Sequence, residues 1–165
     1  MFVIVMGVTG SGKSTIGRLL AGRLALPFHD ADDYHSPENR AKMAADIALD
    51  EADRKPWLAN LARLALEWQA AGGAVLACSA LKRAHREVLL AQVPEHRVVY
   101  LDLPRASAER RLAERRGQHQ FVREFQHLLD GQYRDLEPPS DALQLASDLP
   151  VEEIVTRAAA YVRAG

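Results

Sequence analysis

The sequence has very little cysteine, no long apolar run and no excess of charge of one sign. Its single cysteine, Cys78, excludes an intramolecular disulfide framework and fits a reducing cytoplasm. No stretch approaches the roughly 20 apolar residues that a membrane-spanning helix needs. The 21 Lys and Arg residues are balanced by 22 Asp and Glu residues, which argues against a nucleic-acid-binding protein. We therefore expect a cytoplasmic protein that binds neither membranes nor nucleic acids.

The length of 165 residues is typical of one domain, here predicted to span residues 1–165. Short apolar runs alternate with longer stretches of helical periodicity, which indicates an α/β fold with a parallel sheet. The predicted strands are residues 2–6, 27–29, 74–78, 98–103 and, more weakly, 142–146. Helices are predicted at residues 14–24 and 56–71 and from about residue 150 onward. Residues 46–55 and 117–126 are the least regular, and we expect them to be mobile loops.

The first predicted strand runs directly into a glycine-rich loop. Residues 7–14 read GVTGSGKS and match the phosphate-loop pattern G-x-x-x-x-G-K-[ST], with a strand before it and a helix after it. In such a loop, backbone N–H groups and the N-terminal end of the following helix surround the β-phosphate of a nucleotide. We therefore expect the nucleotide to contact Gly7, Thr9, Gly10, Ser11, Gly12, Lys13, Ser14 and Thr15.

The other motifs and the length of the chain indicate which class of phosphate-loop protein this is. The D-x-x-G and N-K-x-D motifs of a regulatory GTPase are absent, and the chain is too short for a transporter-type ATPase. A small phosphoryl-transfer enzyme that uses ATP and Mg²⁺ remains. In it, Lys13 would reach the β- and γ-phosphates, and the Ser14 hydroxyl would ligate Mg²⁺.

Two acidic residues follow the second predicted strand. Asp30 and Asp32 form a D-x-D pair, and in an extended segment this spacing points both side chains the same way. Asp30 could hold Mg²⁺ through water, while Asp32 accepts a proton from a substrate hydroxyl. The alternative is an acidic surface turn that includes Asp33. Asp102, at the end of a later strand, is a weaker candidate because the first two acids already fill these roles.

Two groups of cationic side chains indicate an anionic ligand. Lys82, Arg83 and Arg86 follow the third predicted strand and suit an anionic substrate. A second region, between residues 105 and 123, is rich in arginine. We interpret it as a lid whose arginines close over the triphosphate; the alternative is a solvated helix paired with Glu109 and Glu114. Its members are Arg105, Arg110, Arg111, Arg115, Arg116 and Arg123.

Longer motifs give the chain a family resemblance. Residues 30–35 read DADDYH, followed by Asn39 and Lys42; residues 53–58 read DRKPWL; residues 78–82 read CSALK, followed by Arg86; and residues 136–139 read LEPP. Together these resemble the gluconate kinases of the phosphate-loop, nucleoside-monophosphate-kinase-like group. The resemblance implies ATP-dependent phosphorylation of D-gluconate to 6-phospho-D-gluconate. It also implies a five-stranded parallel sheet with helices on both faces, a lid over about residues 115–135 and a homodimer.

The resemblance further implies roles for individual residues. Asp30, Asp32, His35, Arg54, Lys82 and Arg86 would surround the acceptor, and Arg111 and Arg115 match lid arginines that stabilise the transferred group. Three differences from the family pattern bear on lid geometry and acceptor choice: ADIALDE at residues 45–51, His85 in place of Tyr, and a lengthened stretch after Gly117. Two alternatives stay open, namely a kinase for another small acid such as shikimate and a nucleotide-binding sensor with little turnover. The Gly-Gly-Gly strand end of the shikimate enzymes is absent.

Overall fold

Five parallel strands form one sheet in the computed structural model, which confirms the α/β fold. The structure describes residues 1–45, 47–116 and 122–165, without the side chains of residues 115, 116 and 122–125. The sheet has the order β2-β3-β1-β4-β5, and every described pairing is parallel. The strands are β1 (Phe2–Met6), β2 (Phe28–Asp30), β3 (Ala74–Ala77), β4 (His96–Asp102) and β5 (Leu143–Ala146).

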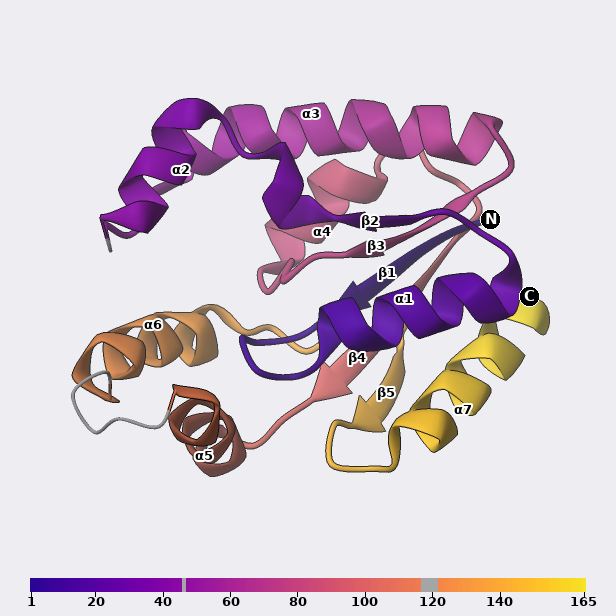
Figure 1. Cartoon of the computed structure of the whole chain (residues 1–165). Helices are drawn as coiled ribbons and strands as arrows, with labels where there is room; N and C mark the ends of the chain where they lie inside the picture. The colour runs from indigo at the N-terminus through magenta and orange to yellow at the C-terminus, as the bar shows by residue number, and fades with distance from the viewer. Residues whose placement is uncertain (46, 117–121) are drawn as a thin grey trace.

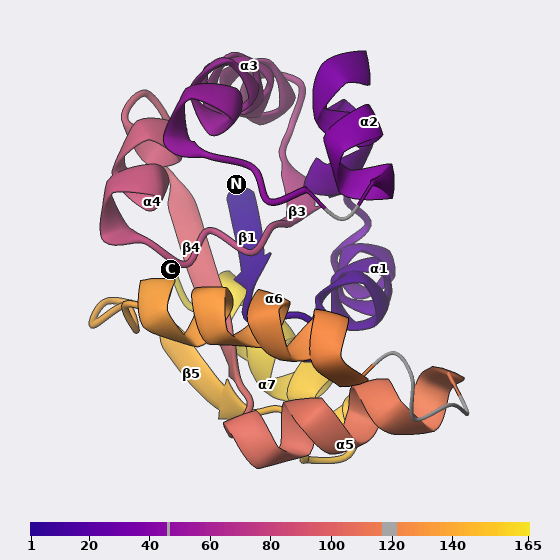
Figure 2. The same cartoon turned by 90° about the vertical axis from the view of Figure 1, so that its left-hand side faces the viewer.

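Helices cover both faces of this sheet, as Figure 1 shows. Helices α3 and α4 pack on one face and α1 and α7 on the other. The paired helices α5 and α6 lie beyond the carboxyl ends of the strands (Figures 1 and 2). The bounds are α1 (Lys13–Leu24), the 3₁₀-helix η1 (Ala31–Tyr34), α2 (Pro37–Ala44), α3 (Glu51–Ala70), α4 (Arg83–Leu90), α5 (Arg105–Arg116), α6 (Val122–Asp135) and α7 (Val151–Arg163). Among the described helices, none has the length and apolar character to cross a bilayer.

The central strand β1 divides the core because its side chains alternate between the two faces. Phe2, Ile4 and Met6 pack in the cluster beneath α3 and α4, whereas Val3 and Val5 pack in the cluster beneath α1 and α7. A third apolar cluster joins Val8 and Leu103 to side chains of α5 and α6. Packing therefore connects the loop after β1 to the α5–α6 pair.

The start of α3 corrects the sequence analysis. Residues 46–55 were predicted to be a mobile loop and the helix to begin at Pro56, but α3 begins at Glu51. The Asp50 carboxylate accepts a hydrogen bond from Asp53 N at 2.8 Å, and the Asp53 carboxylate accepts one from Asp50 N at 3.1 Å. This capping box satisfies N–H groups of the first turn and extends the helix upstream of Pro56.

The predicted lid, residues 115–135, coincides largely with α6. Residues 117–121 of the predicted lid lie outside the described residues. The part of the predicted loop 117–126 that the structure describes is helical from Val122 onward.

Candidate active site

The loop between β1 and α1 has the geometry of an anion-binding turn. Gly12, at the start of α1, has φ of 91°, in the left-handed region that favours glycine. A Cβ atom on Gly7 would lie 2.8 Å from the carbonyl oxygen of Leu101, so no larger residue fits there. No side-chain hydrogen bond caps α1, and the partial positive charge at the N-terminal end of a helix favours a bound anion.

Side chains from three separate segments donate hydrogen bonds to the carbonyl groups of this loop. Lys13 Nζ donates to Val8 O at 3.0 Å, Arg111 Nη1 donates to Gly10 O at 3.0 Å, and Ser147 Oγ donates to Ser11 O at 2.6 Å. Arg111 also binds Ser147 through Nη1–Oγ at 2.8 Å and Nη2–O at 2.7 Å. The structure therefore places Arg111 of α5 against the phosphate loop.

A cavity of about 480 Å³ lies next to the loop. Its walls come from the loop and α1, from Arg111 and Glu114 of α5, and from residues that follow β5. The lining combines polar groups such as Thr15 and Arg111 with apolar Leu149 and Ile154, which suits a nucleoside. The cavity is thus a candidate site for the base and ribose of a nucleotide whose phosphates lie in the loop.

The first of the predicted acids contacts the phosphate loop directly. Ser14 Oγ, in the first turn of α1, donates to Asp30 Oδ2 at the end of β2 with a distance of 2.6 Å. Hydroxyl and carboxylate oxygens are hard donors of the type that Mg²⁺ prefers, and Mg²⁺ in kinase sites needs few protein ligands. This pair therefore fits a magnesium site.

The second acid, Asp32, lies beside the first but for a different reason from the one predicted. Asp32 belongs to η1 rather than to an extended segment, and its N–H donates to Asp30 Oδ1 at 3.1 Å. Loss of hydration raises the pKa of Asp32 and the Asp30 carboxylate raises it further, while His35 and Lys13 oppose the shift. Asp32 is therefore more basic than an ordinary aspartate, which suits a proton acceptor.

His35 lies next to Asp32 in a buried position. Its imidazole stacks on the Trp57 ring with centroids 4.4 Å apart and planes inclined by 14°. Its Nε2 atom is 3.9 Å from Asp32 Oδ1. Trp57 is fixed in turn, because its Nε1 donates to Ala31 O at 3.0 Å. Helix α3 thus holds His35 against the carboxylate.

Two of the predicted acceptor-binding cations, Lys82 and Arg54, meet at a carboxylate that sequence analysis did not select. Lys82 Nζ lies 2.6 Å from Glu51 Oε1, and Arg54 Nη1 lies 3.7 Å from the same atom. His85 Nε2 is 3.0 Å from Glu51 Oε2. The hydrogen bonds from Lys82 and His85 lower the pKa of Glu51 to about 2. A carboxylate is therefore already bound where these cations converge.

Arg86 has contacts different from those expected of an acceptor-binding residue. Its side chain is buried, and it donates to Ala80 O at 2.9 Å, Leu81 O at 2.8 Å and Glu137 O at 2.9 Å. Ala80 has φ of 40°, a strained value for alanine. These contacts support a structural role for Arg86, which holds the segment that carries Lys82.

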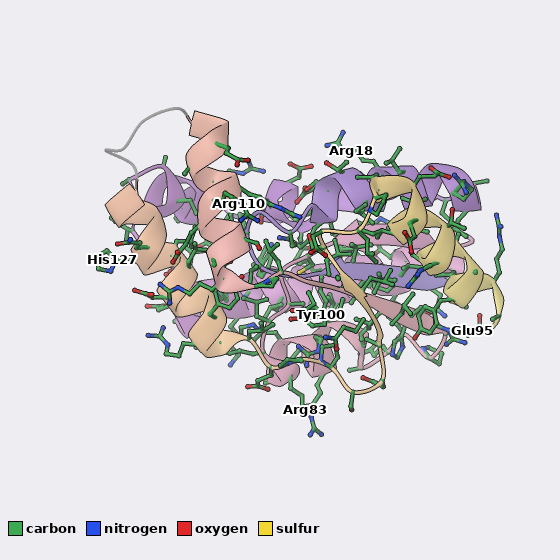
Figure 3. The ribbon with its side chains drawn as sticks, turned by 90° about the horizontal axis from the view of Figure 1, so that it is seen from below. Arg18, Arg83, Glu95, Tyr100, Arg110 and His127 are labelled. Carbon is green, nitrogen blue, oxygen red and sulfur yellow. The ribbon has the colours of Figure 1, made fainter. Side chains whose placement is uncertain are left out.

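The nearby cation Arg83 points away from the protein body (Figure 3) and pairs with Glu87.

Comparison with known proteins decides the family. The shikimate kinase family model matches residues 9–158. A probable gluconokinase from Mus musculus is 42% identical over 92% of this chain and 92% of its own length. The chain belongs to the gluconokinase family. Thermoresistant gluconokinase from Escherichia coli strain K12 is 34% identical over 98% of this chain and 93% of its own.

A solved structure agrees with this gluconokinase assignment. The crystal structure of a gluconokinase from Sinorhizobium meliloti 1021 has a TM-score of 0.85 and 33% identity, and the match covers 98% of this chain and 91% of that one. The phosphate-loop kinase fold predicted from the sequence is thereby confirmed. The matching shikimate kinase model describes only the broader family that contains the gluconokinases.

Besides Glu51, two further residues of this gluconokinase-family site were not predicted. Gln132 of α6 contacts Thr9, and Ser147 after β5 contacts Ser11. Gln132 lies within the predicted lid, residues 115–135, which was a signal for it, whereas no sequence pattern marks Ser147. The predicted lid arginine Arg115 has its side chain outside the described part of the chain.

Cys78 and Asp102 both have surroundings that indicate structural roles. Cys78 is buried, and its burial raises the pKa of the thiol to about 12, which excludes a nucleophilic thiolate at neutral pH. Asp102 accepts hydrogen bonds from Tyr100 Oη at 3.2 Å and Gln144 Nε2 at 3.0 Å. These contacts with neighbouring strand residues support a structural role for Asp102.

Proposed function

We propose that the protein transfers the γ-phosphoryl group of ATP to D-gluconate and forms ADP and 6-phospho-D-gluconate. The observation that carries this proposal is the 42% identity with a probable gluconokinase over 92% of both chains. The site supports it, because a phosphate loop, a pair of carboxylates and a cluster of cations lie at the carboxyl ends of neighbouring strands.

The donor side of the reaction uses the loop and α5. ATP phosphates bind to the N–H groups of residues 7–15, and the nucleoside occupies the cavity beside Arg111. Lys13 follows the γ-phosphate as it moves, and Arg111, with Arg115, stabilises the transferred group. Ser14 and Asp30 hold Mg²⁺, which when bound neutralises charge on the β- and γ-phosphates.

The acceptor side uses η1, α3 and the segment after β3. Asp32 orients the acceptor hydroxyl and takes its proton while the hydroxyl oxygen bonds to phosphorus and the bond from phosphorus to the ADP oxygen breaks. His35 lies beside that carboxylate. Lys82 and Arg54 pair with the carboxylate of gluconate at the position where they now contact Glu51.

An assay of ADP formation separates this proposal from its two alternatives. The protein is supplied with Mg²⁺ and ATP, and with gluconate, shikimate or no acceptor, and Lys13→Ala is the control. We expect rapid ADP formation with gluconate alone and a loss of about a hundredfold or more in the variant. Faster turnover with shikimate would refute gluconate as acceptor, and slow turnover under every condition would indicate a nucleotide sensor.

Two further expectations belong to this proposal. A cytoplasmic location is supported by the single buried cysteine, which a reducing compartment keeps as a thiol. The homodimer implied by the family resemblance is tested by light scattering during size-exclusion chromatography. A mass of two chains is the expected result, and a mass of one chain at high protein concentration would contradict it.

A further inference from the structure

Asn39 of α2 is a buried residue whose amide contacts two other elements. It is 4% exposed. Its Nδ2 atom is 3.0 Å from the main-chain oxygen of Asp53 in α3 and 3.3 Å from Nδ1 of His35. Neither contact was anticipated from the sequence, although Asn39 belongs to the motif that carries the family resemblance.

The contact with Asp53 decides which way the Asn39 amide points. A main-chain carbonyl only accepts hydrogen bonds, so the atom beside it must be the amino group of the asparagine. Asp53 is itself held firmly. Its carboxylate binds Lys42 Nζ at 2.7 and 2.8 Å and takes part in the capping box with Asp50. The first turn of α3 therefore fixes the orientation of the Asn39 amide.

The orientation of this amide in turn decides the protonation of the imidazole. An amino group can only donate, so His35 Nδ1 must accept and carries no proton. In a neutral imidazole the proton then resides on Nε2, the atom 3.9 Å from Asp32 Oδ1. The stack on Trp57 fixes the plane of the His35 ring.

We infer that Asn39 is a positioning residue that holds His35 in the neutral tautomer with its proton on Nε2, directed at Asp32. His35 is then a hydrogen-bond donor in the site and cannot receive a proton from the acceptor. A substrate hydroxyl beside both side chains accepts from His35 Nε2–H and donates to Asp32 Oδ1. Asp32 alone of the two takes the proton. This last step rests on the proposed kinase function, whereas the tautomer does not.

The charges around His35 agree with a neutral ring. Burial lowers the pKa of His35, and the guanidinium groups of Arg40 in α2 and Arg54 in α3 lower it further, while Asp32 of η1 raises it. Arg40 is fixed close by, because its Nε donates to His35 O at 3.2 Å. Two cations thus oppose a second proton on the ring, and one carboxylate favours it.

Nuclear magnetic resonance measures the tautomer directly. The protein is labelled with ¹⁵N-histidine, and long-range ¹H–¹⁵N correlations are recorded near pH 7.5 without ligands, with His35→Gln identifying the signals of His35. We expect Nδ1 to resonate as an unprotonated nitrogen and Nε2 as a protonated one. A proton on Nδ1, alone or together with Nε2, would overturn the inference. This spectrum requires no knowledge of the acceptor.

Two variants test whether Asn39 is responsible. Asn39→Asp replaces the amino group with an oxygen that can only accept, so it draws a proton to His35 Nδ1. If the ring stays neutral, Nε2 has lost its proton and can no longer donate a hydrogen bond. If the ring is doubly protonated, its positive charge pairs with Asp32 and weakens that carboxylate as a base. We expect kcat to fall at least about tenfold in either case, with KM for ATP unchanged. Ser36→Ala is the matched control, since Ser36 Oγ accepts from the main-chain N of Asn39 at 3.1 Å and takes no part in the described polar contacts of the His35 ring.

The outcomes separate the inference from the proposed function. If Asn39→Asp and Ser36→Ala show the same His35 spectrum and the same kcat, Asn39 is merely structural and the inference is wrong. If Asn39→Asp does not fold, the spectrum of the unmutated protein still decides the tautomer. If the predicted tautomer is present but gluconate is not phosphorylated, the proposed acceptor fails and the role of Asn39 stands.

Discussion

Thr9 in the phosphate loop and Gln132 in α6 exchange two hydrogen bonds across the site. Thr9 N donates to Gln132 Oε1 at 2.7 Å, and Gln132 Nε2 donates to Thr9 Oγ1 at 2.9 Å. The next residue, Tyr133, donates through its hydroxyl to Leu103 O at 2.5 Å, after β4. These bonds tie α6 to the loop that we propose binds the ATP phosphates.

Replacing Gln132 tests this connection. Gln132→Ala removes both bonds, and we expect KM for ATP to rise about fivefold, the equivalent of about 1 kcal/mol. Gln132→Glu keeps an acceptor for Thr9 N but places a negative charge near the phosphates, so its effect should be larger. Gln69→Glu, near the C-terminal end of α3, is the charge-matched control. Equal KM values in Gln132→Glu and Gln69→Glu would contradict the connection.

We propose that Glu51 competes with the acceptor for the same cations. Its carboxylate binds Lys82 and His85, so an anionic acceptor must displace it to reach Lys82. We expect Glu51→Gln to lower KM for gluconate about threefold or more and to leave KM for the neutral polyol sorbitol unchanged. Glu67→Gln, which removes an exposed partner of Arg63 on the same helix, is the control. A higher KM for gluconate in Glu51→Gln would show that the glutamate helps acceptor binding.

Arg86 is expected to act on stability rather than on acceptor binding. Arg86→Met removes two buried hydrogen bonds, to Ala80 O and Leu81 O, and a partly buried one to Glu137 O, and we expect the free energy of unfolding to fall by about 3 kcal/mol or more. Arg83→Met is the control, since its exposed side chain should change stability by only about 0.5 kcal/mol. Urea unfolding measures both. A stable Arg86→Met protein with a greatly raised KM for gluconate would contradict this and support the acceptor-binding role predicted from the sequence.

His29 makes stability depend on pH. Its ring stacks on Trp68 with centroids 4.0 Å apart, its Nδ1 is 2.8 Å from Tyr34 Oη, and burial lowers its pKa from the ordinary 6.5. The unfolded chain therefore takes up a proton at a higher pH than the folded one. Its contribution to stability is complete above pH 6.5 and is lost as the pH falls toward the lowered folded value.

The variant His29→Phe keeps an aromatic ring on Trp68 without the titration. Urea unfolding between about pH 7.5 and about pH 5 should show a smaller loss of stability than in the unmutated protein. His127→Gln, on the exposed side of α6 (Figure 3), should behave like the unmutated protein. The role of His29 is disproved if all three proteins lose stability equally over this range.

Features that depend on local sequence were predictable. The strand at residues 2–6 and the loop GVTGSGKS are coded within one short segment, and the structure confirms both β1 and the loop geometry. The start of α3 was missed because the proline at 56 resembled a first helical residue, whereas a capping box places that start at Glu51.

Contacts between distant segments could not be predicted from one sequence. Arg86 follows a strand end just as a substrate-binding cation would, and only the fold shows that carbonyl groups surround it. Thr9 and Gln132 are 123 positions apart. The Asp30–Asp32 pair was found for an incorrect reason, because a 3₁₀ turn rather than an extended strand places Asp32 beside the Asp30 carboxylate.

The identity of the phosphorylated product tests the central claim most directly. The protein is incubated with Mg²⁺, ATP and D-gluconate, and the product is analysed by ³¹P and ¹³C nuclear magnetic resonance, with Lys13→Ala as the inactive control. We expect a phosphate ester on carbon 6 of gluconate, formed together with an equal amount of ADP and absent from the control. A folded protein that yields no gluconate phosphate, or one that places the phosphate on another carbon, would contradict the account.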